Sequence, residues 1–248
     1  MTILNDIVKN TKAKLVEKKA AVSLDEIKLQ LSRLDLPKGK FKASLAGKAE
    51  AVIAEIKKAS PSAGIISENF DPIQKAREYE DFGAVALSIL TEEDFFLGSN
   101  QYLKDVKAIT SLPILRKDFM VDEYQIYEAK LIGADCILLI ASILSDIEIT
   151  DFVALAEVLE LDYLIEVHDA EELQRVEHFN NALIGVNNRN LKTFEVDINN
   201  SVNLKNSFSG DNIFIAESGI KNKDDLSYLK ERGISVFLIG ESLMRGSF

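Results

Sequence analysis

Charged, amide and hydroxyl side chains stand inside or directly after short runs of apolar residues in this chain. They are Glu55, Lys57, Ser88, Lys117, Glu166, Asn187, Glu217 and Ser218. A carboxylate flanked by Ile, Leu or Val is costly to bury unless it is paired, so Glu55 and Glu166 are expected to belong to a functional site or at least to ion pairs. Where carboxylates and lysines converge, the negative charges keep the lysines protonated, which makes Lys57 and Lys117 candidate general acids or anion ligands. A lysine that traps a carbonyl group as a Schiff base is the alternative chemistry for the same two residues.

Eight apolar, β-branched runs recur along the chain, and their first residues are 20 to 33 positions apart. The runs are residues 51–56, 84–90, 113–117, 135–141, 162–167, 182–187, 212–217 and 235–239. Continuous apolar runs are typical of parallel strands that are covered on both faces, and segments between these runs have helical spacing. Gly83, Gly133 and Gly233 stand where three of these helices are expected to end. Eight strand–helix units predict an α/β fold, the (β/α)8 TIM barrel; a doubly wound open sheet is the alternative, but the chain lacks its Gly-rich first turn.

A barrel of this kind brings the carboxyl ends of all its strands to one mouth, where the active sites of such barrels lie. The polar residues at the strand ends are therefore expected to face one another. Gly219 and Gly240 follow the last two strands, where barrels commonly bind phosphate through backbone N–H groups. The fold thus predicts a phosphate-binding site at that side of the mouth.

Residues 1–48 precede the repeat and form a helical extension within a single domain that spans residues 1–248. Apolar residues at helical spacing predict a first helix, and Ser23 with Glu26 has capping-box spacing ahead of a second one that runs through Leu34. The extension is expected either to plug the bottom of the barrel or to lie as a lid on the substrate site. Only residues 240–248 follow the last strand, so the eighth outer helix is expected to be missing or truncated, which would expose an apolar strip on the first and eighth strands.

Composition and motifs argue against several classes of protein. The net charge of −11 argues against a nucleic-acid surface, and no apolar run is long enough to span a membrane. The first residues contain lysines and no apolar signal segment, so a cytoplasmic protein is expected. The single cysteine, Cys136, is expected in the core, and His168 and His178 on or near the surface of a helix, so no metal centre is predicted. The acidic run 92–94 is expected to face solvent, and neither a Walker A nor a nicotinamide-binding pattern occurs.

Seven segments of the chain, taken in order, resemble indole-3-glycerol phosphate synthase. They are AEIKKASPSAG (54–64), LSILTEEDFFLGS (87–99), ILRKDFMVDEYQIYEAKLIGAD (114–135), LIEVHD (164–169), IGVNNRNL (184–191), AESGI (216–220) and FLIGESLM (237–244). The amino-terminal extension is similar to the helical extension of that family. The resemblance implies a carbon–carbon lyase of tryptophan biosynthesis. Such an enzyme closes the ring of 1-(2-carboxyphenylamino)-1-deoxyribulose 5-phosphate with loss of carbon dioxide and water, and it needs no metal or organic cofactor.

The resemblance also implies roles for individual residues. Lys117 would protonate the ribulose keto oxygen as the ring carbon attacks, Glu166 would act as a general acid or base in the dehydration, and Lys57 would hold the anthranilate carboxylate and share the acid role. The groups that orient these residues or the sugar hydroxyls would be Glu55, Asn187, Glu217 and Ser218. The phosphate would be bound by Arg189 and by the backbones of Gly219 and Gly240. The residues around the aromatic ring would be Phe96, Phe119, Leu138, Ile140 and Leu191. Further contacts with the substrate would come from Ser60, Ser88 and Glu241.

Two other functions stay open at this point. One is a different phosphate-binding barrel enzyme, such as a sugar-phosphate isomerase or an aldolase, and the other is a non-catalytic barrel that binds a phosphorylated ligand. In each case the expected partner is a small phosphorylated molecule rather than nucleic acid or a membrane. The expected assembly is a monomer or a weak homo-oligomer.

Overall fold

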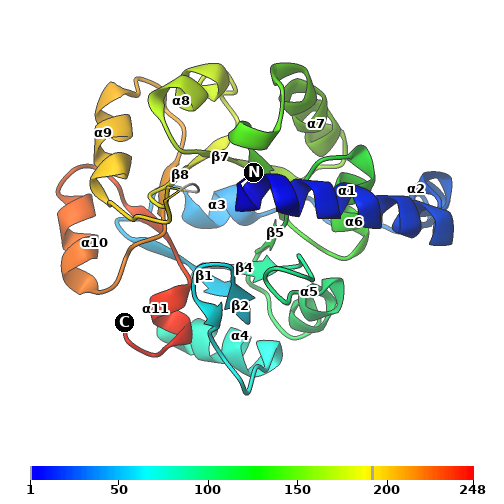
Figure 1. Ribbon diagram of the computed structural model, residues 1–248, viewed down its shortest axis with the longest axis horizontal. Coiled ribbons are helices and arrows are strands. Elements are labelled where there is room, and N and C mark those ends of the chain that lie inside the picture. Colours follow the sequence, from blue (N-terminus) through cyan, green and yellow to red (C-terminus); the bar gives the residue numbers. More distant parts are fainter. Residues whose placement is uncertain (1, 191–192) are drawn as a thin grey trace.

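The computed structural model describes residues 2–190 and 193–248, and a closed barrel of parallel strands lies at its centre (Figure 1). The strands are β1 (Ala51–Ile56), β4 (Ala86–Leu90), β5 (Ile114–Lys117), β6 (Cys136–Ile140), β7 (Asp162–Val167), β8 (Leu183–Asn187), β9 (Phe214–Glu217) and β10 (Val236–Ile239). Neighbours in the barrel follow this order, and β10 pairs with β1 to close it. Each strand lies within one of the eight apolar runs, so the predicted (β/α)8 TIM barrel is confirmed.

Helices alternate with the strands and cover the outside of the barrel. They are α4 (Pro72–Phe82), α5 (Asn100–Lys107), α6 (Glu123–Leu131), α7 (Asp146–Val158), α8 (Ala170–Val176), α9 (Asn199–Ser207), α10 (Lys223–Lys230) and α11 (Glu241–Met244). Local chemistry sets their ends: Asp71 caps the first backbone N–H groups of α4, and Gly83 ends that helix at φ +93°, a conformation that a Cβ atom would strain. Two loops carry further elements, the antiparallel pair β2 (Ala59–Ser60) and β3 (Gly64–Ile65) after β1, and the 3-10 helix η1 (Ala141–Ile143) after β6.

The core has two layers, because successive side chains of a strand point to opposite faces of the sheet. One layer fills the barrel interior and includes Ile53, Leu115 and Leu164; the other packs between the strands and the outer helices. At the carboxyl end of the barrel, the inward positions change from apolar to charged. In β1, for example, Ala51 and Ile53 share the interior layer and Glu55 follows at the same spacing. The same alternation that builds the core therefore delivers charged side chains to the mouth.

The amino-terminal extension reaches both ends of the barrel. It contains α1 (Ile3–Ala21), α2 (Leu24–Leu31) and α3 (Phe41–Leu45). Figure 1 shows α1 running from the centre of the barrel outward over α6. Lys14 of α1 forms ion pairs with Glu93 (2.9 Å) and Asp94 (2.7 Å) in the loop after β4. At the other end, Phe41 and Leu45 are buried in the interior layer of the barrel. The lid and the plug that the sequence offered as alternatives are thus both present, in different segments.

The segment after β10 differs in one respect from expectation. The helix after β10 is α11, which has four residues in this structure. The predicted exposed strip is wrong, because Val52 of β1 is 6% exposed and Phe237 of β10 is fully buried. Leu243 and Met244 of α11 join the outer core layer, and Phe248 packs against it with its ring 6.0 Å from that of Phe82. Residues 241–248 therefore cover the strip that a longer helix would cover.

Within the described residues, no helix is long and apolar enough to cross a membrane, and no group of three or more His, Cys, Asp or Glu side chains could hold a metal ion. Cys136 is buried inside the barrel, as expected. Burial raises the pKa of its thiol well above the ordinary value, so the residue is part of the core and is not a nucleophile.

Candidate active site

The carboxyl ends of the strands surround a cavity of about 620 Å³, a size typical of small-molecule sites. Most of the sequence-predicted residues line it: Glu55, Lys57, Ser60, Phe96, Lys117, Phe119, Leu138, Ile140, Glu166, Asn187, Arg189, Glu217, Ser218, Gly219, Gly240 and Glu241. Ser88 does not; it is fully buried, paired in register with Glu55 between β1 and β4. Leu191 lies outside the described residues. The barrel therefore brings together side chains that are up to 186 positions apart, from Glu55 to Glu241.

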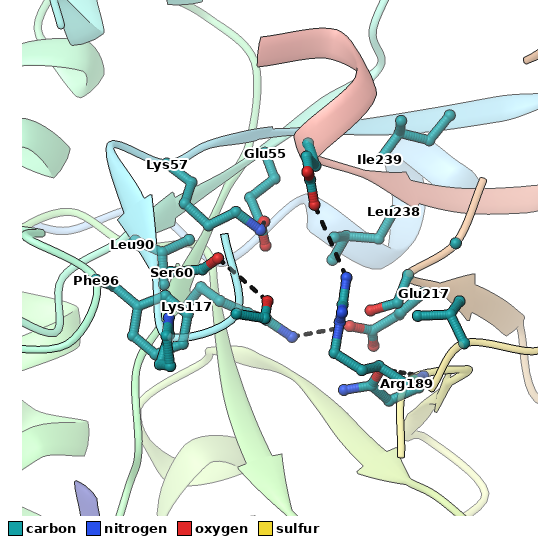
Figure 2. A pocket seen from close by; sticks show the side chains of 18 of the residues that line it. Glu55, Lys57, Ser60, Leu90, Phe96, Lys117, Arg189, Glu217, Leu238 and Ile239 are labelled. Atoms are coloured by element: carbon teal, nitrogen blue, oxygen red, sulfur yellow. Dashed lines mark hydrogen bonds and ion pairs between the residues drawn. The ribbon is translucent and has the colours of Figure 1, made fainter. Parts of the chain in front are cut away.

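Lys117, the last residue of β5, lies at the centre of the charged part of the cavity (Figure 2). Its Nζ donates to Glu166 Oε2 of β7 at 2.7 Å and to Glu217 Oε2 of β9 at 2.8 Å. Burial lowers the pKa of Lys117, but the negative charges of Glu166, Glu217 and Glu55 outweigh burial and hold the pKa above its usual value. Lys117 is therefore a cation whose N–H groups can donate a hydrogen bond or a proton to a bound oxygen atom.

The two carboxylates bound to Lys117 differ in their ionisation. Burial raises the pKa of Glu166, but Lys117, His168 and a hydrogen bond from Asn187 outweigh burial and lower it to about 2. For Glu217, burial and the charge of Glu166 outweigh the attraction of Lys117 and raise the pKa to about 7. One carboxylate is thus ionised and the other is largely protonated just below neutral pH, which is the arrangement of a general base beside a general acid.

Lys57 and Glu55 form a second ion pair in the wall, with Lys57 Nζ 2.5 Å from Glu55 Oε1. The two side chains are 16% and 5% exposed. Gly240, which follows β10, lies against them: a Cβ atom at this position would collide with Glu55 Oε1 and come within 3.2 Å of Lys57 Nζ. Figure 2 shows Lys57 and Glu55 pointing toward one another at the edge of the cavity. Glycine is needed here because the backbone passes so close to the pair.

One side of the cavity is apolar. The rings of Phe96 and Phe119 lie 5.9 Å apart at 39°, and Leu138 and Ile140 of β6 line the same cavity. Glu92 holds the loop that carries Phe96, because its carboxylate accepts hydrogen bonds from the backbone N–H groups of residues 94, 95 and 96. The expectation that the whole run 92–94 faces solvent is therefore wrong for Glu92, which is 5% exposed. The slot has the shape and polarity to hold an aromatic ring.

The opposite side of the cavity is polar and cationic. Arg189 follows β8, and its Nη2 lies 3.8 Å from Glu241 Oε2. Ser218 and Gly219 turn the chain sharply after β9, with φ values of +64° and +82°. Gly240 and the hydroxyl of Ser60 belong to the same cavity. Figure 2 shows Phe96 and Arg189 on opposite sides of the charged centre, so a molecule with an aromatic ring at one end and an anion at the other fits across it.

Some residues of the site were not found from the sequence. Ile3, Leu4 and Ile7 of α1 line the cavity, which agrees with the lid alternative, although the sequence did not identify these residues individually. Arg245 after α11 also lines the cavity and was not predicted. His168 was placed wrongly on a helix surface. It follows β7, its side chain is 14% exposed, and its Nε2 lies 3.5 Å from Glu166 Oε1. The spacing of His168 could have indicated its position, because every second residue of a strand points to the same face and Leu164 and Glu166 point into the barrel. His178 is exposed, as expected.

Comparisons with known proteins agree with this geometry. A family model described as indole-3-glycerol phosphate synthase matches residues 4–247. Proteins named indole-3-glycerol phosphate synthase are 48% identical over 243 residues in Clostridium acetobutylicum and 49% identical over 245 residues in Ruminiclostridium cellulolyticum. These alignments cover 98% of this chain and 92% and 94% of the relatives.

Solved structures show the fold alone. N-acetylmannosamine-6-phosphate 2-epimerase from Clostridium perfringens superposes with a TM-score of 0.58 at 14% identity, covering 79% of this chain and 88% of that one. A chain of the tryptophan synthase α2β2 complex from Pyrococcus furiosus gives the same TM-score and identity, covering 79% of this chain and 89% of that one. With the matched family model and relatives at 45–49% identity over nearly its whole length, the chain belongs to the indole-3-glycerol phosphate synthase family.

Proposed function

We propose that this chain catalyses the reaction of its family through the residues of the barrel mouth. The substrate is 1-(2-carboxyphenylamino)-1-deoxyribulose 5-phosphate, and the product is indole-3-glycerol phosphate. The observation that carries the assignment of roles is the position of Lys117, bound to Glu166 and Glu217, in a cavity with an aromatic slot on one side and a cationic rim on the other.

Binding across the cavity brings the two reacting carbon atoms together. The anthranilate ring packs against the apolar wall that contains Phe96 and Phe119. The phosphate lies against Arg189 and the backbone N–H groups after β9 and β10. Lys57 binds the ring carboxylate. The open ribulose chain must bend between these anchors, so much of the catalysis comes from holding it in a near-attack shape, an effect that reaches about 7–11 kcal/mol in well-oriented intramolecular reactions.

Ring closure needs a proton donor at the keto oxygen. The aromatic carbon that bears the carboxylate attacks the keto carbon, and the carbonyl π electrons move to oxygen. Lys117 donates a proton to that oxygen as the negative charge develops, which gives a hydroxyl group. Because an alkoxide is far more basic than an amine, this transfer is downhill even from a lysine whose pKa is raised by three carboxylates.

Two eliminations complete the product. Carbon dioxide leaves from the attacked ring carbon, and its bonding electrons restore the aromatic ring. Water then leaves: Glu166, the ionised carboxylate, removes a proton from the carbon next to nitrogen, and a protonated lysine gives a proton to the departing hydroxyl group. The lysines donate two protons and Glu166 takes up one, so each turnover consumes one proton from solvent, which together with the proton returned by Glu166 restores the lysines to their protonated state.

The proposal includes the setting in which the enzyme works. We expect a cytoplasmic protein that is a monomer or a weak homo-oligomer and does not bind nucleic acid. The net charge of −11 supports this expectation, because it opposes association with polyanions and favours solubility.

Indole fluorescence tests the proposed activity. Purified protein is mixed with the carboxyphenylamino ribulose phosphate, and emission from the indole product is followed; a rise that requires the protein supports the proposal. Folded protein without any rise contradicts it. Borohydride added with a ketose phosphate tests the aldolase alternative, because a lysine Schiff base would be reduced to a stable adduct that mass spectrometry detects.

A further inference from the structure

Lys117 alone does not distinguish the two carboxylates that it binds. Its Nζ is 2.7 Å from Glu166 Oε2 and 2.8 Å from Glu217 Oε2, and the side chains are 4% and 2% exposed. Two buried carboxylates that share one ammonium group favour the uptake of one proton by the pair. Which of them carries that proton must therefore be decided by the other oxygen atom of each carboxylate.

The environments of these second oxygen atoms are unlike. Glu166 Oε1 accepts a hydrogen bond from Asn187 Nδ2 at 3.0 Å and lies 3.5 Å from His168 Nε2. Glu217 Oε1 is buried and has no hydrogen-bond partner among the described residues. The cavity therefore offers donors to Glu166 and leaves one oxygen of Glu217 without any.

Glu172 of α8 holds the imidazole ring of His168 in place. Glu172 Oε2 accepts a hydrogen bond from the backbone N–H of His168 at 2.8 Å and lies 3.1 Å from its Nδ1. An ionised carboxylate can only accept, so Nδ1 carries hydrogen toward Glu172. Nε2 is buried without a hydrogen-bond partner among the described residues, and it faces the carboxylate of Glu166. A ring between two carboxylates is favoured as the imidazolium cation, with hydrogen on both nitrogen atoms.

We propose that His168 is a positioning residue that decides which of the two carboxylates bound to Lys117 carries the proton. As an imidazolium it keeps Glu166 ionised and leaves the proton on Glu217. The charged groups around the ring are Glu172 from α8, Glu166 from β7 and Glu217 from β9, with Lys117 of β5 beyond Glu166. The elements β8 and α9 contribute amides, Asn187 on Glu166 and Asn200 on the His168 carbonyl. The consequence for turnover rests on the proposed function, in which Glu166 is the base.

The pKa shifts agree with this geometry. Burial lowers the pKa of His168, but the hydrogen bond to Glu172 and the charges of Glu166 and Glu172 outweigh burial and raise it above 6.5. Coupling between two groups is reciprocal. The charge of Glu166 must therefore raise the pKa of His168 by as much as His168 lowers that of Glu166.

A histidine titration tests the proposal without any activity. The chain has two histidines, so the NMR signal that survives in His178→Gln is that of His168. We expect its pKa above 6.5 in the wild type and lower by about one unit or more in both Glu166→Gln and Glu172→Gln, with Glu171→Gln, an exposed neighbour on α8, as the matched control. A pKa of 6.5 or less in the wild type, or one that Glu166→Gln leaves unchanged, would overturn the proposal.

The pH dependence of turnover tests the consequence for catalysis. Below the His168 pKa, we expect kcat of His168→Gln to be about two- to tenfold below wild type, because the proton of the pair is no longer confined to Glu217. The ratio of wild-type kcat to variant kcat should fall toward one as pH rises through the His168 pKa, because the wild-type imidazole then loses the positive charge that the variant lacks at every pH. A ratio that is constant with pH indicates a merely structural role and contradicts the proposal. If the protein does not turn over this substrate at all, the proposed function fails, while the NMR titration still decides the role of His168.

Discussion

Ionisation of Glu217 is expected to lower the free energy of unfolding as pH rises. Its side chain is 2% exposed, and its Oε1 has no hydrogen-bond partner among the described residues. Burial raises its pKa to about 7, from an ordinary value of 4.5. When folding raises the pKa of a carboxyl group, the folded protein is most stable below the pKa of that group in the unfolded chain. This stability is lost as pH rises through the pKa of the group in the folded protein. The window is therefore pH 4.5 to 7. At 1.36 kcal/mol per pH unit, the loss over this window is on the order of 3 kcal/mol.

The perturbation is Glu217→Gln, which keeps the shape of the protonated carboxyl group and cannot ionise. Urea unfolding of wild type and variant is measured at several pH values from 5 to 8.5, and the difference in free energy of unfolding is plotted against pH. We expect the variant to gain up to about 3 kcal/mol relative to wild type across this range. Glu241→Gln, at the half-exposed rim of the same cavity, controls for the loss of one carboxylate. A difference that does not change with pH would refute the raised pKa of Glu217.

Three further predictions concern the cavity. Lys117→Met should lower kcat by about 10³-fold with an unchanged circular dichroism spectrum, because the general acid is lost while the barrel core is intact; near-normal turnover would move the acid role to Lys57. Gly185→Ala should push the Glu217 carboxylate away from Lys117, because the new Cβ would collide with Glu217 Oε1, and should lower both the melting temperature and kcat; an unchanged kcat would show that this contact is dispensable. Arg189→Ala should raise KM more than tenfold, about 1.4 kcal/mol or more of lost binding, with a small effect on kcat, and should weaken inhibition by inorganic phosphate; an unchanged KM would place the phosphate elsewhere.

The sequence was most informative where a single physical constraint dominates. Parallel strands covered on both faces must be apolar throughout, so the eight runs marked the barrel strands to within a few residues. Charged residues at the carboxyl ends of these runs then had to meet at one mouth. Lys117 and Glu166 are 49 positions apart in the chain and 2.7 Å apart in the structure for this reason.

Sequence reasoning failed where contacts between distant segments decide the outcome. The sequence left open whether the extension is a lid or a plug, and the contacts of Ile3 and Ile7 with the cavity show that α1 is the lid. Phe237 is buried in the outer core layer, which Leu243 joins and against which Phe248 packs. Glu92 is buried because a turn directs three backbone N–H groups at its carboxylate. The acidic run in which it stands predicted a solvent-exposed loop instead. His168 follows β7 directly and continues the two-residue alternation of Leu164 and Glu166, so its inward position was predictable from the sequence.

A crystal structure with a substrate analogue bound would show whether Lys117 reaches the oxygen atom that must be protonated. In the analogue, the keto group of the substrate is reduced to an alcohol, so the ring cannot close and the oxygen that must be protonated stays in place. We expect Lys117 Nζ within about 3 Å of that oxygen, the aromatic ring against Phe96 and Phe119, and the phosphate against Arg189 and Gly219. A structure in which Lys117 keeps only its two carboxylate partners and the oxygen lies elsewhere would contradict this expectation.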